Sequence, residues 1–262
     1  MKRQFAHMAM LLGLLLGLAG CSSNNIEQAV DIVGKQCPME LGNAGEIKSV
    51  YLDNNQVLFI YVMNEDLFHI ESLQLNPDAS KYDIKMLLSN ADANIKNLLD
   101  AAIAADMPIK FVFEGQLSRK KAEMTLTMDE MRECYRNCNL EPQEKLYEAL
   151  DATNLLMPIK VSDDMTIDKV MLDGETVVYV YVIANEMADL EQFAKDKEFF
   201  QEDLRHNLHD MGENDPAFRA FMIMIANAGK NLAYRYVVGK DKKYADIVVT
   251  NKELRPLLHM EQ

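Results

Sequence analysis

Residues 47–63 read IKSVYLDNNQVLFIYVM, and residues 167–183 read IDKVMLDGETVVYVYVI. The two stretches align without a gap at a shift of 120 residues. Each holds two apolar runs separated by a polar pair, Asp53-Asn54 or Asp173-Gly174, of a kind that favours a tight turn. Both stretches therefore predict a β-hairpin, and their similarity predicts that this hairpin occurs twice in the chain.

The similarity extends beyond the hairpins in both directions. Residues 26–65 align with residues 146–185 at the same shift, and a shift of 123 residues aligns residues 111–132 with residues 234–255. In each copy an amphipathic helix precedes the hairpin and a long helical segment with an apolar stripe follows it. Two strands and a short helix then complete the copy. We interpret this pattern as an internal duplication.

The repeated order predicts an α+β protein, a tandem duplication of an α-β-β-α-β-β-α unit in which a four-stranded antiparallel sheet is covered by helices. A capping-box pattern marks the last helix of each unit, Thr127 with Glu130 and Thr250 with Glu253. The predicted segments are a signal peptide (1–20), a tether (21–25), a first repeat unit (26–138), a linker (139–145) and a second repeat unit (146–262).

The chain opens with a basic head, an apolar run and a small-residue ending. The run after Lys2 and Arg3 is too short to span a bilayer, and it ends in Leu18-Ala19-Gly20-Cys21. This ending resembles the lipobox of bacterial lipoproteins. The resemblance implies that Cys21 carries fatty acyl chains such as palmitate, becomes the first mature residue and anchors the protein in the bacterial cell envelope. The resemblance also implies the outer membrane if the cell is Gram-negative, because Ser22, the residue after Cys21, is not acidic.

The composition is that of an acidic globular protein. Asp and Glu number 41 and Lys and Arg 27, which gives a formal net charge of −14. This charge argues against nucleic acid as a partner. The low counts of Gly (11) and Pro (7) exclude collagen-like and low-complexity chains. We expect no cofactor, and we expect partners among proteins, peptides or glycans besides the membrane itself.

The three other cysteines are interpreted through the repeat. Cys37 aligns with Met157 and Cys134 aligns with Leu257, so both positions lack a thiol in the second unit. In an oxidising compartment this predicts a disulfide between Cys37 and Cys134, with Cys138 as the alternative partner of Cys37. A metal site formed by the three thiols is a further alternative.

Histidines suggest a second metal hypothesis. His206, His209 and Asp210 lie within one turn of a predicted helix, close to Glu202 and Glu213. Two imidazoles and a carboxylate are a ligand set that a divalent ion uses in proteins. A solvated, charged helix surface explains the same residues, and the first unit has nothing comparable.

Aromatic pairs lie on one face of two predicted strands, because Phe59/Tyr61 and Tyr179/Tyr181 are each two residues apart. These rings are expected to pack in the core or between the units, or else to line a groove that binds a ligand. The sequence contains no glycine-rich phosphate loop, no Gly-x-Ser-x-Gly and no His-Glu-x-x-His. We therefore favour a non-catalytic binding or assembly module. The alternatives are an extracytoplasmic hydrolase that uses acidic residues and a periplasmic metal-binding protein.

Overall fold

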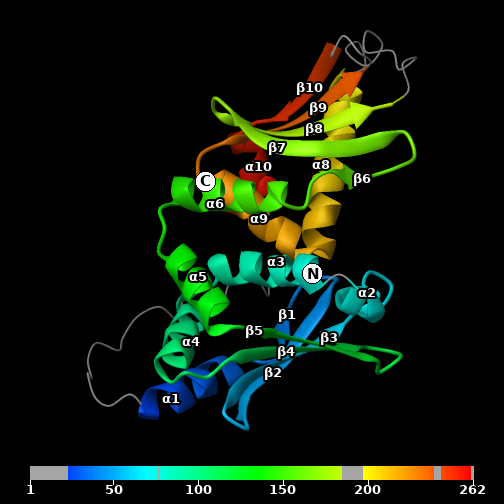
Figure 1. Cartoon of the computed structure of the whole chain (residues 1–262). Helices are drawn as coiled ribbons and strands as arrows, with labels where there is room; N and C mark the ends of the chain where they lie inside the picture. Colours follow the sequence, from blue (N-terminus) through cyan, green and yellow to red (C-terminus); the bar gives the residue numbers. More distant parts are fainter. Residues whose placement is uncertain (1–22, 76, 185–196, 239–242, 261–262) are drawn as a thin grey trace, which may run out of the picture.

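The computed structural model describes residues 23–75, 77–184, 197–238 and 243–260 (Figure 1). The predicted signal peptide and Cys21 lie outside these residues. The N-terminal half contains α1 (Ser23–Gly34), β1 (Met39–Glu40), β2 (Gly45–Asp53), β3 (Gln56–Met63), α2 (Ile70–Leu75), α3 (Pro77–Ser89), α4 (Ala93–Ala104), β4 (Ile109–Gly115), β5 (Lys121–Leu126) and α5 (Met128–Cys138). The C-terminal half contains α6 (Pro142–Asn154), β6 (Ile159–Lys160), β7 (Met165–Asp173), β8 (Thr176–Ile183), α8 (Lys197–Asn214), α9 (Pro216–Asn227), β9 (Asn231–Val238), β10 (Lys243–Val249) and α10 (Asn251–Leu257).

Each half contains one five-stranded mixed sheet, with the strand orders β1-β2-β3-β4-β5 and β6-β7-β8-β9-β10. Neighbouring strands are antiparallel except for the pairs β3–β4 and β8–β9, which are parallel. The pairing is irregular between Ile47 and Ser49 in one sheet and between Ile167 and Lys169 in the other. Strand order, strand direction and this irregularity are therefore the same in the two halves.

The mixed α+β class is confirmed, but the expected four-stranded antiparallel sheet is wrong in two respects. The edge strands β1 and β6 add a fifth strand to each sheet, and strands of two residues show no alternating pattern in the sequence. In addition, the helical segment after β3 returns the chain to the end of the sheet where β3 began. The next strand, β4, therefore runs parallel to β3.

Helices cover the face of each sheet that carries the aromatic rings. In the N-terminal half, these rings and buried residues of α1, α3, α4 and α5 form one hydrophobic cluster. In the C-terminal half, α6, α8, α9 and α10 contribute to a second cluster. The two sheets lie at opposite ends of the molecule, with α3, α6 and α9 between them (Figure 1).

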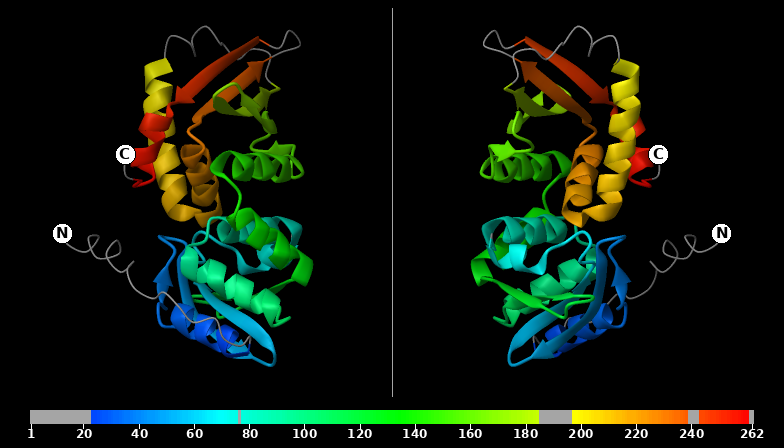
Figure 2. Two further views of the ribbon diagram at one scale, coloured as in Figure 1. Left: turned by 90° about the vertical axis from the view of Figure 1, so that its left-hand side faces the viewer. Right: turned by 90° about the vertical axis from the view of Figure 1, so that its right-hand side faces the viewer.

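The two halves meet through these three helices (Figures 1 and 2). Met86 of α3 is buried in the hydrophobic cluster of the C-terminal half. Around it, Tyr82 Oη lies 2.6 Å from Thr153 Oγ1, and Asn90 Nδ2 donates a hydrogen bond of 3.0 Å to the carbonyl of Ala220. This part of the contact between the halves is helix against helix, with an apolar centre and polar bonds at its margin.

The helix boundaries agree with the sequence signals at several points. Capping boxes are confirmed at Thr127 and Thr250, where each hydroxyl accepts the N–H of the Glu three residues later. Helix α1 already begins at Ser23, inside the predicted tether (21–25), and α6 begins at Pro142, inside the predicted linker (139–145). Among the described helices, none has the length and apolar character to cross a bilayer.

The predicted disulfide is wrong, because Cys37, Cys134 and Cys138 are all free. Cys134 is fully buried in the N-terminal core, the half-buried Cys37 packs at its edge, and Cys138 Sγ lies 3.0 Å from the carbonyl of Leu88. The aligned Met157 and Leu257 occupy the corresponding places around the second core. Both cysteine positions face apolar surroundings, so an unpaired thiol serves there as a small apolar side chain. The apolar residues at the aligned positions of the C-terminal half are therefore explained without any covalent link.

Candidate functional site

The aromatic pairs lie inside the two cores. Phe59 and Phe111 stack with ring centroids 5.4 Å apart, and Tyr179 and Tyr234 stack at 5.5 Å. Phe59 is only 2% exposed. The rings point from the sheet toward the helices that cover it, and the cluster around Tyr179 also includes Met86 and Tyr82 of α3 from the N-terminal half. Their two-residue spacing serves the packing of sheet on helix.

The buried tyrosines of these clusters keep their protons. Burial raises the pKa of Tyr61, and it raises the pKa of Tyr179 and Tyr234 well above the ordinary value for a phenol. A phenol that stays neutral throughout the physiological range supplies no base. The aromatic clusters thus contribute packing and offer no acid–base chemistry.

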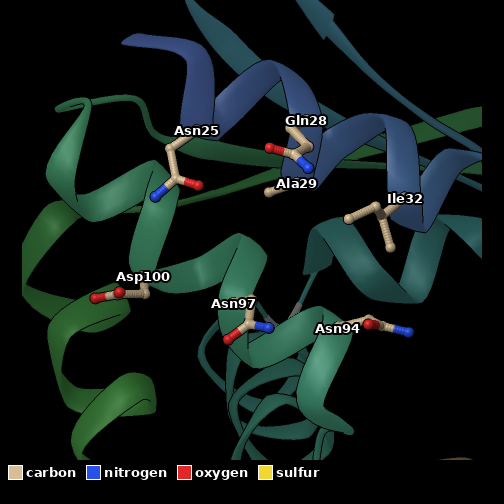
Figure 3. Close-up of a pocket in the computed structure, with 7 residues that line it drawn as sticks. All are labelled: Asn25, Gln28, Ala29, Ile32, Asn94, Asn97 and Asp100. Atoms are coloured by element: carbon tan, nitrogen blue, oxygen red, sulfur yellow. The ribbon is translucent and has the colours of Figure 1, made fainter. Parts of the chain in front are cut away.

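A polar groove lies between α1 and α4 on the surface of the N-terminal half (Figure 3). Its volume is about 250 Å³. Side chains from the two helices face each other across it: Asn25, Gln28, Ala29 and Ile32 from α1, and Asn94, Asn97 and Asp100 from α4. Four of these seven side chains are amides, and Asp100 is the one titratable group among them.

The helical period places these groups together. On α1, Ile26, Val30 and Val33 turn into the core, which leaves Asn25 and Gln28 on the outer side of the helix. On α4, Leu98 and Leu99 are buried, while Asn97 is exposed. Sequence reasoning did not single out these amides, because polar residues opposite an apolar stripe are also what any solvated helix shows. Only the packing of α1 beside α4 brings the two polar faces together.

The predicted histidine set divides into two parts. His206 pairs with Asp210, with Nε2 and Oδ2 3.5 Å apart, and both side chains are largely exposed. His209 turns toward a different group, and ligand atoms of His209, Glu213 and His259 all lie within 4.8 Å of one another. The sequence does not point to His259 as a partner, because it lies fifty positions beyond His209 and leaves no local spacing to detect.

The cluster of His209, Glu213 and His259 lies at the end of α8. His209 and Glu213 are four residues apart and share one helix face. His259 follows α10 in a left-handed backbone conformation (φ 57°), and its Nε2 lies 3.5 Å from Glu213 Oε1. The two imidazole rings meet edge to face with centroids 5.7 Å apart. Three side chains that ligate transition metals thus converge from α8 and from the turn after α10.

Hydrogen bonds from neighbouring segments hold the turn that carries His259 and the end of α8 that carries Glu213. Arg219 Nη2 donates to the carbonyl of Leu258 at 2.9 Å, which fixes the turn that carries His259. The N–H of Asn43, from the N-terminal half, donates to the carbonyl of Glu213 at 3.0 Å, and Asn43 Nδ2 donates to Asn214 Oδ1 at 2.9 Å. The cluster therefore lies next to a contact between the two halves.

No family model and no curated protein sequence matches the chain. A crystal structure described as that of a "putative secreted protein" from Pseudomonas aeruginosa is similar with a TM-score of 0.35 and 12% sequence identity. The similarity covers 44% of this chain and 94% of that chain.

Proposed function

We propose that this protein is a lipid-anchored lipoprotein of the bacterial cell envelope that acts as a non-catalytic binding module. The Leu18-Ala19-Gly20-Cys21 motif supports the anchor, because it resembles a lipobox. Ser22 after the lipidated cysteine favours the outer membrane. Helix α1 begins at Ser23, so a lipid on Cys21 holds the start of α1 close to the membrane surface. Two or more acyl chains make such an anchor stable.

We further propose that the two halves arose by duplication of one unit. The shared strand order, the parallel pair at the same place and the matching pairing irregularity support this origin. The aligned hairpin sequences at a shift of 120 residues support it independently. The second copy has diverged at the positions of the groove and of the histidines, which leaves each half with a surface of its own.

The groove between α1 and α4 is the proposed binding surface, and its amide lining is the observation that carries this proposal. Asn and Gln side chains both donate and accept hydrogen bonds, as backbone amides do. No aromatic ring is among the residues that line the groove, so it lacks the stacking platform that suits a sugar ring. These features favour an extended peptide segment of a protein partner over a glycan.

The same lining argues against the hydrolase alternative for this groove. Hydrolysis of the glycosidase type uses a pair of carboxyl groups facing one bond. Asp100 is the single carboxylate among the seven lining residues. A groove with one acid and four amides is suited to binding.

Anchoring is tested by labelling cells with an alkyne analogue of palmitate and separating membrane from soluble fractions. We expect the wild-type chain to take up label and sediment with membranes, and Cys21→Ser to lose both properties. The variant Cys37→Ser is the matched control, since it removes another cysteine and leaves the motif intact. Label that persists in Cys21→Ser would contradict the proposal.

Binding is tested with a photo-crosslinking amino acid at Gln28, in the groove, and at Lys252, an exposed position on α10 in the other half. We expect a discrete protein adduct from position 28 and none of that size from position 252. Replacing Asn94 and Asn97 together by Ala should remove the adduct. The same adduct from both positions, or one that persists in the double variant, would rule out the groove as the binding surface.

A further inference from the structure

We propose that His209, Glu213 and His259 form a binding site for one divalent transition-metal ion, with zinc as the representative ion. The site is independent of the lipid anchor and of the groove. Its ligand set is two imidazoles and one carboxylate, which is a combination that zinc uses where it keeps a coordination position open. The structure holds the three groups together although they come from the end of α8 and from the segment after α10.

The ligand atoms would have to move only a short distance toward one another to bind an ion. They lie within 4.8 Å of one another. Ligands around a tetrahedral zinc ion lie roughly 3.4 Å apart, given metal–ligand bonds of about 2.1 Å. His259 is 63% exposed in its side chain, so rotation of this ring toward His209 and Glu213 meets little resistance. The two ligands on α8 are four residues apart on one helix face, which fixes their separation.

The charge of the site also suits a cation. Glu213 contributes a carboxylate, and the chain as a whole carries a formal net charge of −14, which raises the local concentration of divalent ions. Three protein ligands leave a fourth coordination position on the ion. This position is open to solvent on the side of the exposed His259. This position takes water or a donor atom from another molecule.

A metal ion at this site would also stabilise a contact between the two halves. Glu213 is the residue whose carbonyl accepts the N–H of Asn43 from the N-terminal half. A metal bound to the Glu213 carboxylate holds the last turn of α8, and with it the acceptor of this contact between the halves. Zinc should therefore raise the melting temperature of the protein as well as bind to it.

The test is calorimetry with zinc chloride on the purified full-length protein without a histidine tag. We expect one zinc ion at this site, and dissociation constants larger by about tenfold or more in His209→Ala and in His259→Ala. The variant His206→Ala is the matched control, because His206 lies on the same helix, is equally polar and pairs with Asp210. Its zinc affinity should stay within about twofold of the wild type. This change is much smaller than the change expected when a metal ligand is removed.

Nuclear magnetic resonance of the histidine ring nitrogens in the wild-type protein provides a readout that needs no variant. Zinc should shift the signals of His209 and His259 and leave those of His206 in place. The proposal is overturned if no zinc binds, if His209→Ala and His259→Ala bind zinc as the wild type does, or if the His206 signals shift in place of the other two.

Discussion

The side chain of Asn154 forms hydrogen bonds with both backbone groups of Val170. Its amide donates to the Val170 carbonyl at 2.7 Å, and its own carbonyl accepts the Val170 N–H at 2.9 Å. The aligned residues in the N-terminal half are Gly34 and Val50, and a Cβ at Gly34 would lie 2.7 Å from the Val50 carbonyl oxygen. The end of α1 thus contacts β2 directly through backbone atoms, whereas the end of α6 contacts β7 through the side-chain amide of Asn154.

Replacing Asn154 by Ala should destabilise the protein by about 1–3 kcal/mol, because the buried backbone of Val170 loses both partners. Asn154→Asp retains an acceptor for the Val170 N–H but loses the donor to the carbonyl. Urea denaturation measures the free energy of unfolding of both variants. An Asn154→Ala protein as stable as the wild type would show that water replaces the amide at no cost.

Gly34→Ala should also destabilise the protein by about 1–3 kcal/mol, since the new methyl group meets backbone and cannot be accommodated by rotating a side chain. Gly212→Ala in α8 is the control. Its Cβ would meet nothing within 4 Å, so the gain in helix propensity should stabilise the protein by up to about 1 kcal/mol. Thermal unfolding of both variants should shift in opposite directions, and shifts of the same sign would refute this account of Gly34.

Cys134 should resist alkylation in the native protein. Burial raises the pKa of its thiol to about 12, so the reactive thiolate is scarce at neutral pH and the sulfur is inaccessible. The half-buried Cys37 should react faster with iodoacetamide, and Cys134 should react only after denaturant is added. Mass spectrometry of the peptides without reduction checks both rates. A peptide pair linked through Cys37 and Cys134 would contradict the structure.

The junction between the halves should respond to pH through Asp83. Partial removal of hydration by the surrounding protein, together with the carboxylate of Asp215 at the N-cap of α9, raises the pKa of Asp83 to about 7. The proton is held more tightly in the folded than in the unfolded chain, where the pKa is about 4. The resulting stability is therefore fully present below pH 4 and is lost as pH rises through 7.

Asp83→Asn removes this titration and keeps the shape of the side chain. Its melting temperature, relative to that of the wild type, should rise between pH 5 and pH 8. The effect should be modest, because solvent still reaches the Asp83 side chain. Asp163→Asn is the control, because it changes an exposed carboxylate away from the junction. Asp92→Asn would not serve, since Asp92 caps α4. Equal pH profiles for Asp83→Asn and the wild type would show that Asp83 titrates normally.

The features that could be predicted from the sequence are those with a local pattern. The hairpins follow from apolar runs around Asp53-Asn54 and Asp173-Gly174, and the capping boxes follow from Thr and Glu three residues apart. Strands of two residues have no period, so the fifth strand in each sheet was missed. The parallel pairing was missed because it depends on where the helical crossover returns the chain.

The candidate sites show the same division. The burial of Phe59 and Tyr179 follows from their strand spacing. The absence of thiols at the positions aligned with Cys37 and Cys134 has two physical explanations, a disulfide or apolar packing, and the free thiols of the structure favour packing. The meeting of His209 with His259, and of α1 amides with α4 amides, depends on tertiary contacts that leave no spacing in the sequence.

Lipid anchoring through Cys21 can be measured by intact mass spectrometry of the protein purified from bacterial membranes. We expect a chain that starts at Cys21 and exceeds the mass of residues 21–262 by a diacylglyceryl group, with or without a third acyl chain. A chain that still carries residues 1–20, or one that starts elsewhere and bears no lipid, would contradict lipid anchoring.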